Sequence, residues 1–100
     1  MFGSGTKTDK FTYPFVLKAC GDLLLVEIGR KVHGEVVVSG LESDIYVGNS
    51  LLAMYSKFGD MGMARMLFDR MLERDLASWN TIITGYVKNE NPKEALAVFI

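Results

Sequence analysis

The chain has 100 residues, of which 49% are hydrophobic and 23% charged, a balance that is typical of a folded domain and excludes wholesale disorder. Its formal net charge of −1 lacks the basic excess of sequence-independent nucleic-acid binders, so charge alone does not indicate such a partner. The single cysteine, Cys20, excludes an intrachain disulfide, and no run of 18 apolar residues indicates a membrane-spanning helix.

The first part of the chain predicts two helices. The first carries Pro14 in its first turn, where proline costs least, and a turn is expected near residues 21–22. The second is expected to continue through residues 36–38, although three successive valines favour a strand, because Val32 sets a helical register that they extend. We expect it to end at residues 39–40.

The next two predicted helices span residues 47–58 and 61–71. Gly59 and Asp60 separate them, since glycine tolerates the left-handed cap of one helix and aspartate can cap the next. The asparagine and proline of residues 91–92 are expected to begin a later helix in the same way. The helix over residues 47–58 has an apolar stripe made of Leu51, Leu52, Tyr55 and Phe58.

The chain repeats itself. Three stretches align without gaps from Lys10, Ile45 and Leu76, at offsets of 35 and then 31 residues. Each carries a small residue that we expect to let the two helices of a unit approach closely, followed three and four places later by two larger residues. These sets are Gly29 with Val32 and His33, Ala64 with Leu67 and Phe68, and Ala95 with Val98 and Phe99.

This pattern predicts an all-α fold, a right-handed α-solenoid of helix–turn–helix, tetratricopeptide-like repeats. About three repeats are usually needed for a stable solenoid, and here the third unit stops inside its second helix. We therefore expect marginal stability, with melting below roughly 60 °C.

Essentially the whole chain resembles pentatricopeptide repeats. Residues 11–20 resemble the opening of a long-type repeat, residues 49–60 and 64–71 the short type, and residues 73–86 the junction into a standard repeat. The order is similar to a fragment of the plant organellar class that alternates standard, long and short (PLS) units. The resemblance implies the tail of a preceding repeat in residues 1–9, a long-type repeat in 10–44, a short-type repeat in 45–75 and a truncated standard repeat in 76–100.

A second family of helical repeats is a weaker match. Trp79, Tyr86 and Ala95 resemble the signature of protein-binding tetratricopeptide repeats. The uneven period argues against that family, which keeps about 34 residues per repeat. Gly85 also stands directly before Tyr86 instead of three places earlier.

The pentatricopeptide resemblance implies sequence-specific binding of single-stranded RNA, about one base per repeat. In the family this binding serves organellar RNA processing or C-to-U editing, which implies a mitochondrial or chloroplast location. Residues 1–9 carry no transit-peptide pattern. Other RNA-processing proteins are further candidate partners, whereas DNA and membranes are not expected.

The fifth and the last residue of each repeat are the implied base readers. Asn49 with Asp75 favours uridine by family analogy, and Asn80 favours a pyrimidine of either kind. Pro14 has no side-chain hydrogen-bonding group, so the first unit, in which Asp44 is the last residue, should discriminate little. The second residue of each repeat flanks the base; these residues are Phe11, Tyr46 and Ala77, of which Tyr46 is the one expected to stack.

Each of these residues also has a structural interpretation. Asp44 and Asp75 precede helices and can act as N-caps, and the two asparagines near helix starts can act as caps or turn residues. Tyr46 can close a contact between repeats, and Trp79 is expected to be core. At the level of function, the alternatives are a protein–protein interaction solenoid, which the acidic pI of about 5.7 favours, and a vestigial fragment without a tight ligand.

The sequence offers no catalytic centre. His33 occupies the slot of two phenylalanines, and Cys20 occupies a tyrosine slot without an activating histidine nearby in the sequence. The His-x-Glu and Pro-Cys-x-x-Cys zinc signature of cytidine deaminases, with which some members of the alternating class end, is missing. We therefore expect a non-enzyme that needs no metal or cofactor.

Overall fold

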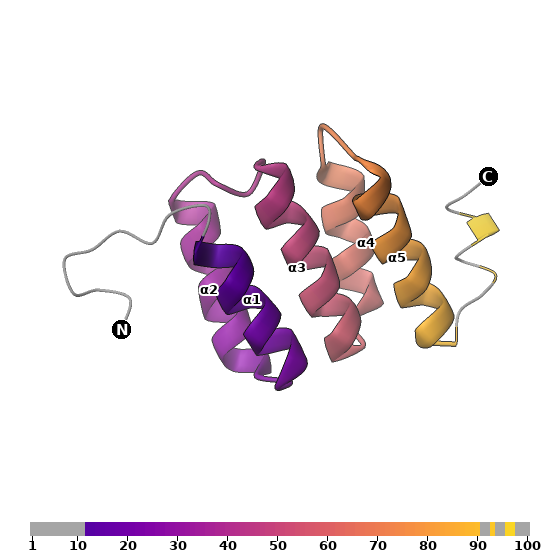
Figure 1. Ribbon diagram of the computed structural model, residues 1–100, viewed down its shortest axis with the longest axis horizontal. Helices are drawn as coiled ribbons and strands as arrows, with labels where there is room; N and C mark the ends of the chain where they lie inside the picture. Colours follow the sequence, from indigo (N-terminus) through magenta and orange to yellow (C-terminus); the bar gives the residue numbers. More distant parts are fainter. Residues whose placement is uncertain (1–11, 91–92, 94–95, 98–100) are drawn as a thin grey trace.

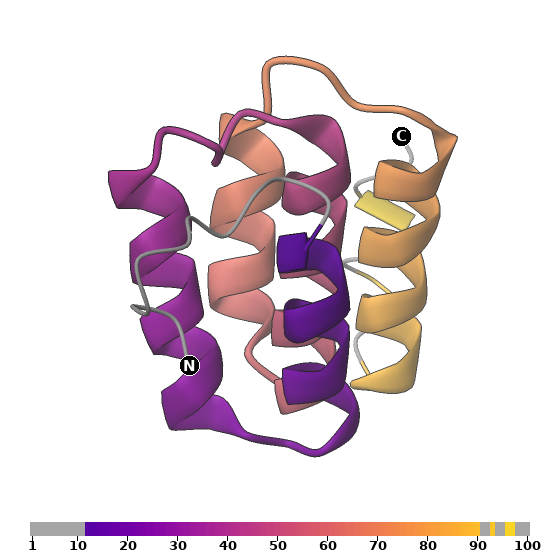
Figure 2. The ribbon, with the colours of Figure 1, turned by 60° about the vertical axis from the view of Figure 1, so that its left-hand side comes forward.

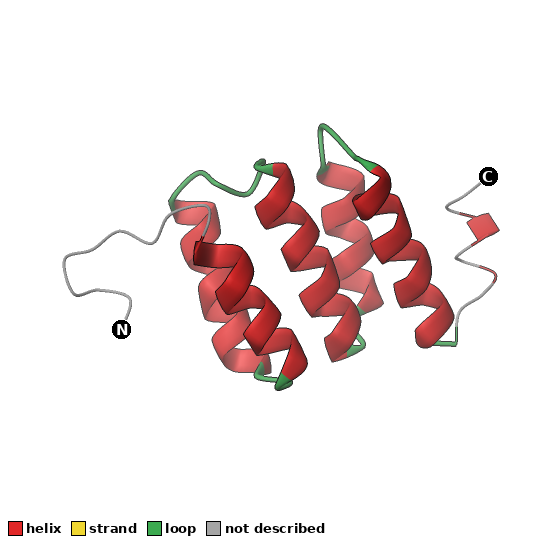
Figure 3. Ribbon diagram, in the orientation of Figure 1, coloured by secondary structure: helices red, strands yellow, loops and turns green. Residues whose placement is uncertain are grey.

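The computed structural model describes residues 12–90 together with residues 93, 96 and 97. Within that part of the chain every regular element is a helix (Figure 3). In chain order they are α1 (Thr12–Asp22), α2 (Val26–Val38), α3 (Ile45–Phe58), α4 (Met61–Arg70) and α5 (Leu76–Lys88).

The helices form two layers. Helices α1, α3 and α5 lie side by side in one layer, and α2 and α4 lie behind them (Figures 1 and 2). Helix α3 is central, because it packs against both α1 and α5 within its layer and against α4 behind it. The molecule extends over 46 × 27 × 16 Å. The predicted all-α solenoid of helical repeats is confirmed.

The core lies between the layers. Leu17, Leu52 and Val32 are fully buried, as the repeat predicts, and Tyr55 and Phe68 are the largest of the fully buried side chains. The stripe predicted for α3 is too narrow, since Met54 and Val47 are buried as well. A helix with neighbours on both sides and behind it buries more than one stripe of side chains.

The helix ends mostly follow the predicted signals. Asp60 caps α4 by accepting a hydrogen bond from the Met63 N–H, and Gly59 ends α3 in the left-handed conformation, at φ +82°. The valines of residues 36–38 are helical, as expected. The caps expected at residues 91–92 lie outside the described part of the chain.

The turn expected near residues 21–22 lies slightly later in the chain. Helix α1 continues through Asp22, and the chain reverses over residues 23–25, where Leu24 takes φ +55°. Gly21 serves a close approach instead of a turn, because an added Cβ would lie 3.2 Å from the Cα of Met54 on α3.

The role expected for the small residue Gly29 also needs correction. An added Cβ there would lie 2.8 Å from the Sδ of Met54 and 3.0 Å from the Cζ of Phe58, and both belong to α3. The nearest neighbours of Gly29 therefore belong to the first helix of the next unit. The matching Ala95, with Val98 and Phe99, is outside the described residues.

No described helix combines the length and the apolar character needed to cross a bilayer.

Candidate functional site

Asn49 and Asp75 are 26 positions apart in the sequence and meet between α3 and α5. Asn49 lies in the second turn of α3, and its Nδ2 donates a hydrogen bond to the Asp75 Oδ1 at 3.1 Å. Asp75 is the N-cap of α5 and accepts a second hydrogen bond, from the Ser78 N–H at 2.9 Å. The structure thus brings together the two residues that the resemblance pairs.

Ser78 completes the network from beneath. Its hydroxyl is fully buried, accepts a hydrogen bond from the Asp75 N–H at 3.2 Å and is a close neighbour of the Asn49 Oδ1. It also lies 3.0 Å from the Asp75 Oδ1, which already receives two N–H groups. Because the hydroxyl has one proton, we assign that proton to the Asn49 Oδ1, which has no other donor in the network.

Hydrogen bonding keeps the Asp75 carboxylate charged. The Ser78 N–H, then the Asn49 amide, lower the pKa of Asp75 below its usual value. At neutral pH the carboxylate is therefore only an acceptor, and the Asn49 NH₂ must face it.

Two shallow grooves flank this network on the layer formed by α1, α3 and α5. The groove between α1 and α3 is lined by Pro14, Asn49 and Lys57, among others. The groove between α3 and α5 is lined by Lys57, Asn80 and Lys88 together with small polar side chains. The predicted readers Pro14, Asn49 and Asn80 thus lie on one continuous face, which we call the groove face.

Sequence reasoning missed the lysines of the groove face. Lys57 and Lys88 stand at equivalent positions of two units, at the same offset of 31 residues that aligns the repeats. Lys18 lies on α1 beside Lys57, and both form ion pairs with Asp22, whose pKa these two lysines lower. The repeat of Lys57 at Lys88 could have indicated a basic surface from the sequence, but the net charge of −1 drew attention away from it.

The remaining predicted residues lie at the edges of this face. Asp44 caps α3 by accepting hydrogen bonds from the Tyr46 N–H at 2.9 Å and the Val47 N–H at 3.1 Å. The capping interpretation of both aspartates is therefore confirmed. Tyr46 and Ala77 are exposed second residues of their units, the former at 68%, while Phe11 lies outside the described residues.

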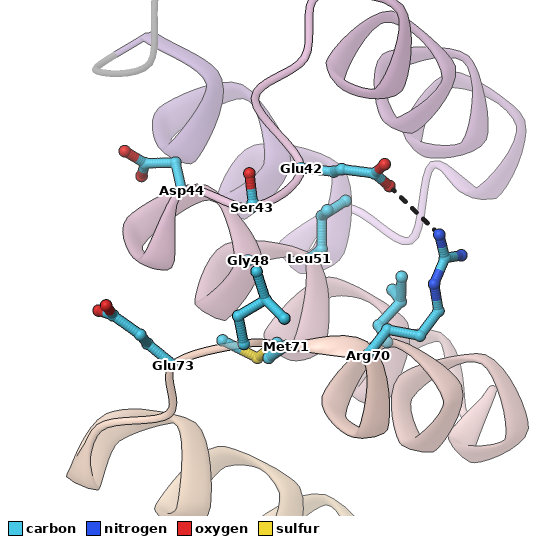
Figure 4. Close-up of a pocket in the computed structure, with 10 residues that line it drawn as sticks. Glu42, Ser43, Asp44, Gly48, Leu51, Arg70, Met71 and Glu73 are labelled. Atoms are coloured by element: carbon cyan, nitrogen blue, oxygen red, sulfur yellow. Dashed lines mark ion pairs between the residues drawn. The ribbon is translucent and has the colours of Figure 1, made fainter.

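The end of the molecule that carries the α2–α3 and α4–α5 loops, which we call the loop end, has a different character (Figure 4). A hollow of about 260 Å³ is lined there by Glu42, Asp44 and Glu73, with Arg70 as the counter-charge. The Arg70 guanidinium lies 3.9 Å from the Glu42 carboxylate, and Met71 packs closely against Gly48. This excess of carboxylates disfavours a polyanion at that end.

The second layer holds the histidine. The Nδ1 of His33 is 2.8 Å from the Oη of Tyr55, and burial lowers the pKa of this half-buried imidazole. Cys20 is buried, and burial raises the pKa of its thiol. The thiol is therefore unreactive. Trp79, which is expected to be core, is partly buried and packs edge-on against the core residue Phe68. The described residues contain no cluster able to hold a metal ion.

Comparison with known proteins agrees with this architecture. Residues 49–76 and 77–100 match the family model described as PPR repeat. The relatives include three Arabidopsis thaliana proteins that are called pentatricopeptide repeat-containing protein. At1g22830 is 50% identical over 95% of this chain and 14% of its own length. At4g25270, chloroplastic, is 44% identical over 99% of this chain and 19% of its own. At3g02330, mitochondrial, is 38% identical over 99% and 11%. The chain thus spans less than a fifth of the length of these relatives.

Proposed function

The chain belongs to the pentatricopeptide repeat family, and from that premise we propose that its groove face binds single-stranded RNA in a sequence-specific manner. The observation that carries the proposal is the Asn49–Asp75 pair, which is held at the surface between two neighbouring first helices. Each asparagine amide offers both a donor and an acceptor, which is what a Watson–Crick edge requires.

Base reading is proposed for Asn49 with Asp75 and for Asn80, and little discrimination for Pro14 with Asp44. By family analogy the first pair takes uridine. Tyr46, with its exposed ring, is proposed to stack on a base, and Ala77 and Phe11 occupy the same flanking position of their units.

The lysines of the groove face provide positive charge that can contact the phosphates of the proposed RNA ligand. Lys57 and Lys88 occupy equivalent positions of the second and third units on the groove face, where the first unit carries Asp22, and a phosphate likewise recurs once per nucleotide. The carboxylate-rich hollow at the loop end makes the groove face the more favourable location for a polyanion. Local charge placement therefore supports RNA binding although the net charge of −1 does not.

For the intact protein we propose a recognition role, without catalysis in this segment, in organellar RNA processing or C-to-U editing. The alternation of long, short and standard units in residues 10–44, 45–75 and 76–100 is part of this proposal. Relatives named chloroplastic and mitochondrial support an organellar location. Other RNA-processing proteins are proposed as further partners.

A protein–protein interaction solenoid is the alternative, and the acidic composition favours it. The dependence of binding affinity on salt concentration distinguishes the two functions. Binding of single-stranded RNA through phosphates weakens with a slope of about −0.7 in log affinity per log salt for each phosphate, so three lysine contacts should give about −2. A peptide in an apolar groove should show a slope near zero.

The direct test uses base preference. The intact chain is titrated with RNAs that differ at one central base, for the wild type and for Asn49→Ala. A uridine preference that disappears in Asn49→Ala assigns the reading role. Binding without preference in the wild type would reduce Asn49 and Asp75 to structural residues, and no binding would favour the protein-binding or vestigial alternative.

A further inference from the structure

Resting on the proposed reading role, we propose that Ser78 is a positioning residue that fixes the orientation of the Asn49 amide and thereby lets Asn49 tell uridine from cytidine. Ser78 belongs to the repeat that follows Asn49, and no base contact is assigned to it. The structure places its buried hydroxyl next to the Asn49 Oδ1.

The network holds the amide at both ends. The Asp75 carboxylate takes the NH₂ end, and the Ser78 hydroxyl takes the carbonyl end. If the amide rotated by half a turn, its oxygen would face the carboxylate and its NH₂ would face the hydroxyl. The first contact would be repulsive, and the hydroxyl proton would lose the Asn49 carbonyl and retain only the Asp75 Oδ1 at 3.0 Å.

Orientation matters because the two pyrimidines present reversed edges. Uracil offers an acceptor at O4 and a donor at N3, whereas cytosine offers a donor at N4 and an acceptor at N3. An asparagine amide that rotates freely can match both orders. One N–H of Asn49 is used by Asp75, and one lone pair of its Oδ1 is used by Ser78. The remaining N–H and lone pair keep fixed positions along the amide, so they match the edge of one pyrimidine only.

The other units supply internal contrasts. In the first unit the position of Ser78 is taken by Val47, which follows Asp44 by three residues and has no hydroxyl. In the last unit no hydrogen bond joins Asn80 to another described side chain, which contrasts with the network around Asn49. Among the described residues, this hydrogen-bond network is found where Asn49, Asp75 and Ser78 meet.

The test compares Ser78→Ala with Ser78→Thr, which keeps the hydroxyl. Affinities of the intact chain for oligouridylate and oligocytidylate of equal length give a uridine-to-cytidine ratio. We expect about fivefold or more for the wild type, the factor that one hydrogen bond corresponds to. Ser78→Ala should bring the ratio near unity, and Ser78→Thr should retain it. Asp60→Ala removes the cap of α4 in the other layer and controls for loss of stability, so it should retain the ratio as well.

A second readout needs no RNA. In nuclear magnetic resonance spectra of the free chain, the Asn49 side chain should show couplings of a single rotamer in the wild type and averaged couplings in Ser78→Ala. A Ser78→Ala variant that keeps both the rotamer and the base ratio overturns the inference and leaves RNA reading intact. A wild type with a fixed rotamer but equal affinity for both pyrimidines overturns the reading role itself.

Discussion

At the residue scale, the chain uses the same atoms for folding and for the proposed recognition. Asp75 caps α5, and the same carboxylate orients Asn49. Capping and base reading therefore do not exclude each other, although the sequence presents them as competing interpretations. An N-cap is a rigid place for a polar side chain, because two backbone N–H groups or a neighbouring side chain hold it there.

Asp75→Asn should relax the specificity without unfolding the chain. Asparagine caps helices about as well as aspartate, so stability should fall by less than about 1 kcal/mol. A carboxamide can face Asn49 with either its oxygen or its NH₂, so the Asn49 amide gains a second orientation. Binding measurements should show increased affinity for oligocytidylate relative to oligouridylate. Asp60→Asn, at the cap of α4, is the matched control, and an unchanged ratio in Asp75→Asn would contradict the account.

At the element scale, glycines determine how the helices end and how closely they approach. Three kinds of position occur: Gly59 has a positive φ, Gly29 and Gly21 lie against α3, and Gly34 is exposed in the middle of α2 with open space around it. Only the backbone conformation and the neighbours distinguish them. The sequence alone therefore identified the helix end at Gly59 but not the close approach of α3 to Gly21 and Gly29.

The same substitution should have opposite effects at two of these positions. Gly59→Ala should destabilise the chain by about 1–2 kcal/mol, because alanine is strained in the left-handed region. Gly34→Ala should stabilise it by about 0.5–1 kcal/mol through helix propensity. Urea unfolding measures both, and a stabilising Gly59→Ala would contradict the assigned helix end.

Helices α2 and α3 are joined by a contact that should respond to pH. Burial has the largest effect on the pKa of His33 and lowers it. The negative charge of Glu42 raises this pKa, and the positive charge of Arg70 lowers it. The neutral imidazole is therefore favoured in the fold. Its contribution to stability is complete above the unfolded pKa of about 6.5 and is lost as the pH falls through the folded pKa.

His33→Phe places in α2 the residue that α4 carries at the equivalent position, Phe68. Between pH 7 and 5 the free energy of unfolding should fall for the wild type and stay nearly constant for the variant. The carboxylates with lowered pKa values, Asp22 and Asp75, titrate in more acidic solution and leave this window clear. Parallel pH profiles for the two proteins would show that His33 is not the responsible group.

The sequence predicts the fold better than the site, for a physical reason. Helical periodicity and an internal repeat are local, so the five helices follow from them. The partners of Asn49 depend on which helices become neighbours: the resemblance supplied Asp75, but nothing in the linear pattern indicated Ser78. The lysines of the groove face were hidden because the 12 acidic residues of the chain balance its 11 lysines and arginines, so the net charge gives no sign of where the lysines gather.

At the scale of the whole molecule, the buried core of the solenoid is small relative to its exposed surface. Side chains such as Phe15, Leu23 and Val38 are more than 60% exposed, which is typical of a stack that continues with further units. We expect the isolated chain to melt below roughly 60 °C, and calorimetry at two scan rates would measure the transition. Appending one further repeat should raise the melting temperature, because it adds one interface. A transition above that limit for the isolated chain would contradict the expected marginal stability.

The central claim is that the groove face formed by α1, α3 and α5 binds single-stranded RNA. The most direct measurement is a titration of the ¹⁵N-labelled chain with oligouridylate, followed by nuclear magnetic resonance. We predict shifts for the side-chain amides of Asn49 and Asn80 and for the backbone around Lys57 and Lys88, with α2 and α4 little changed, and a loss of these shifts at high salt. Shifts confined to α2 and α4, or to the carboxylate-rich hollow at the loop end, would contradict the account.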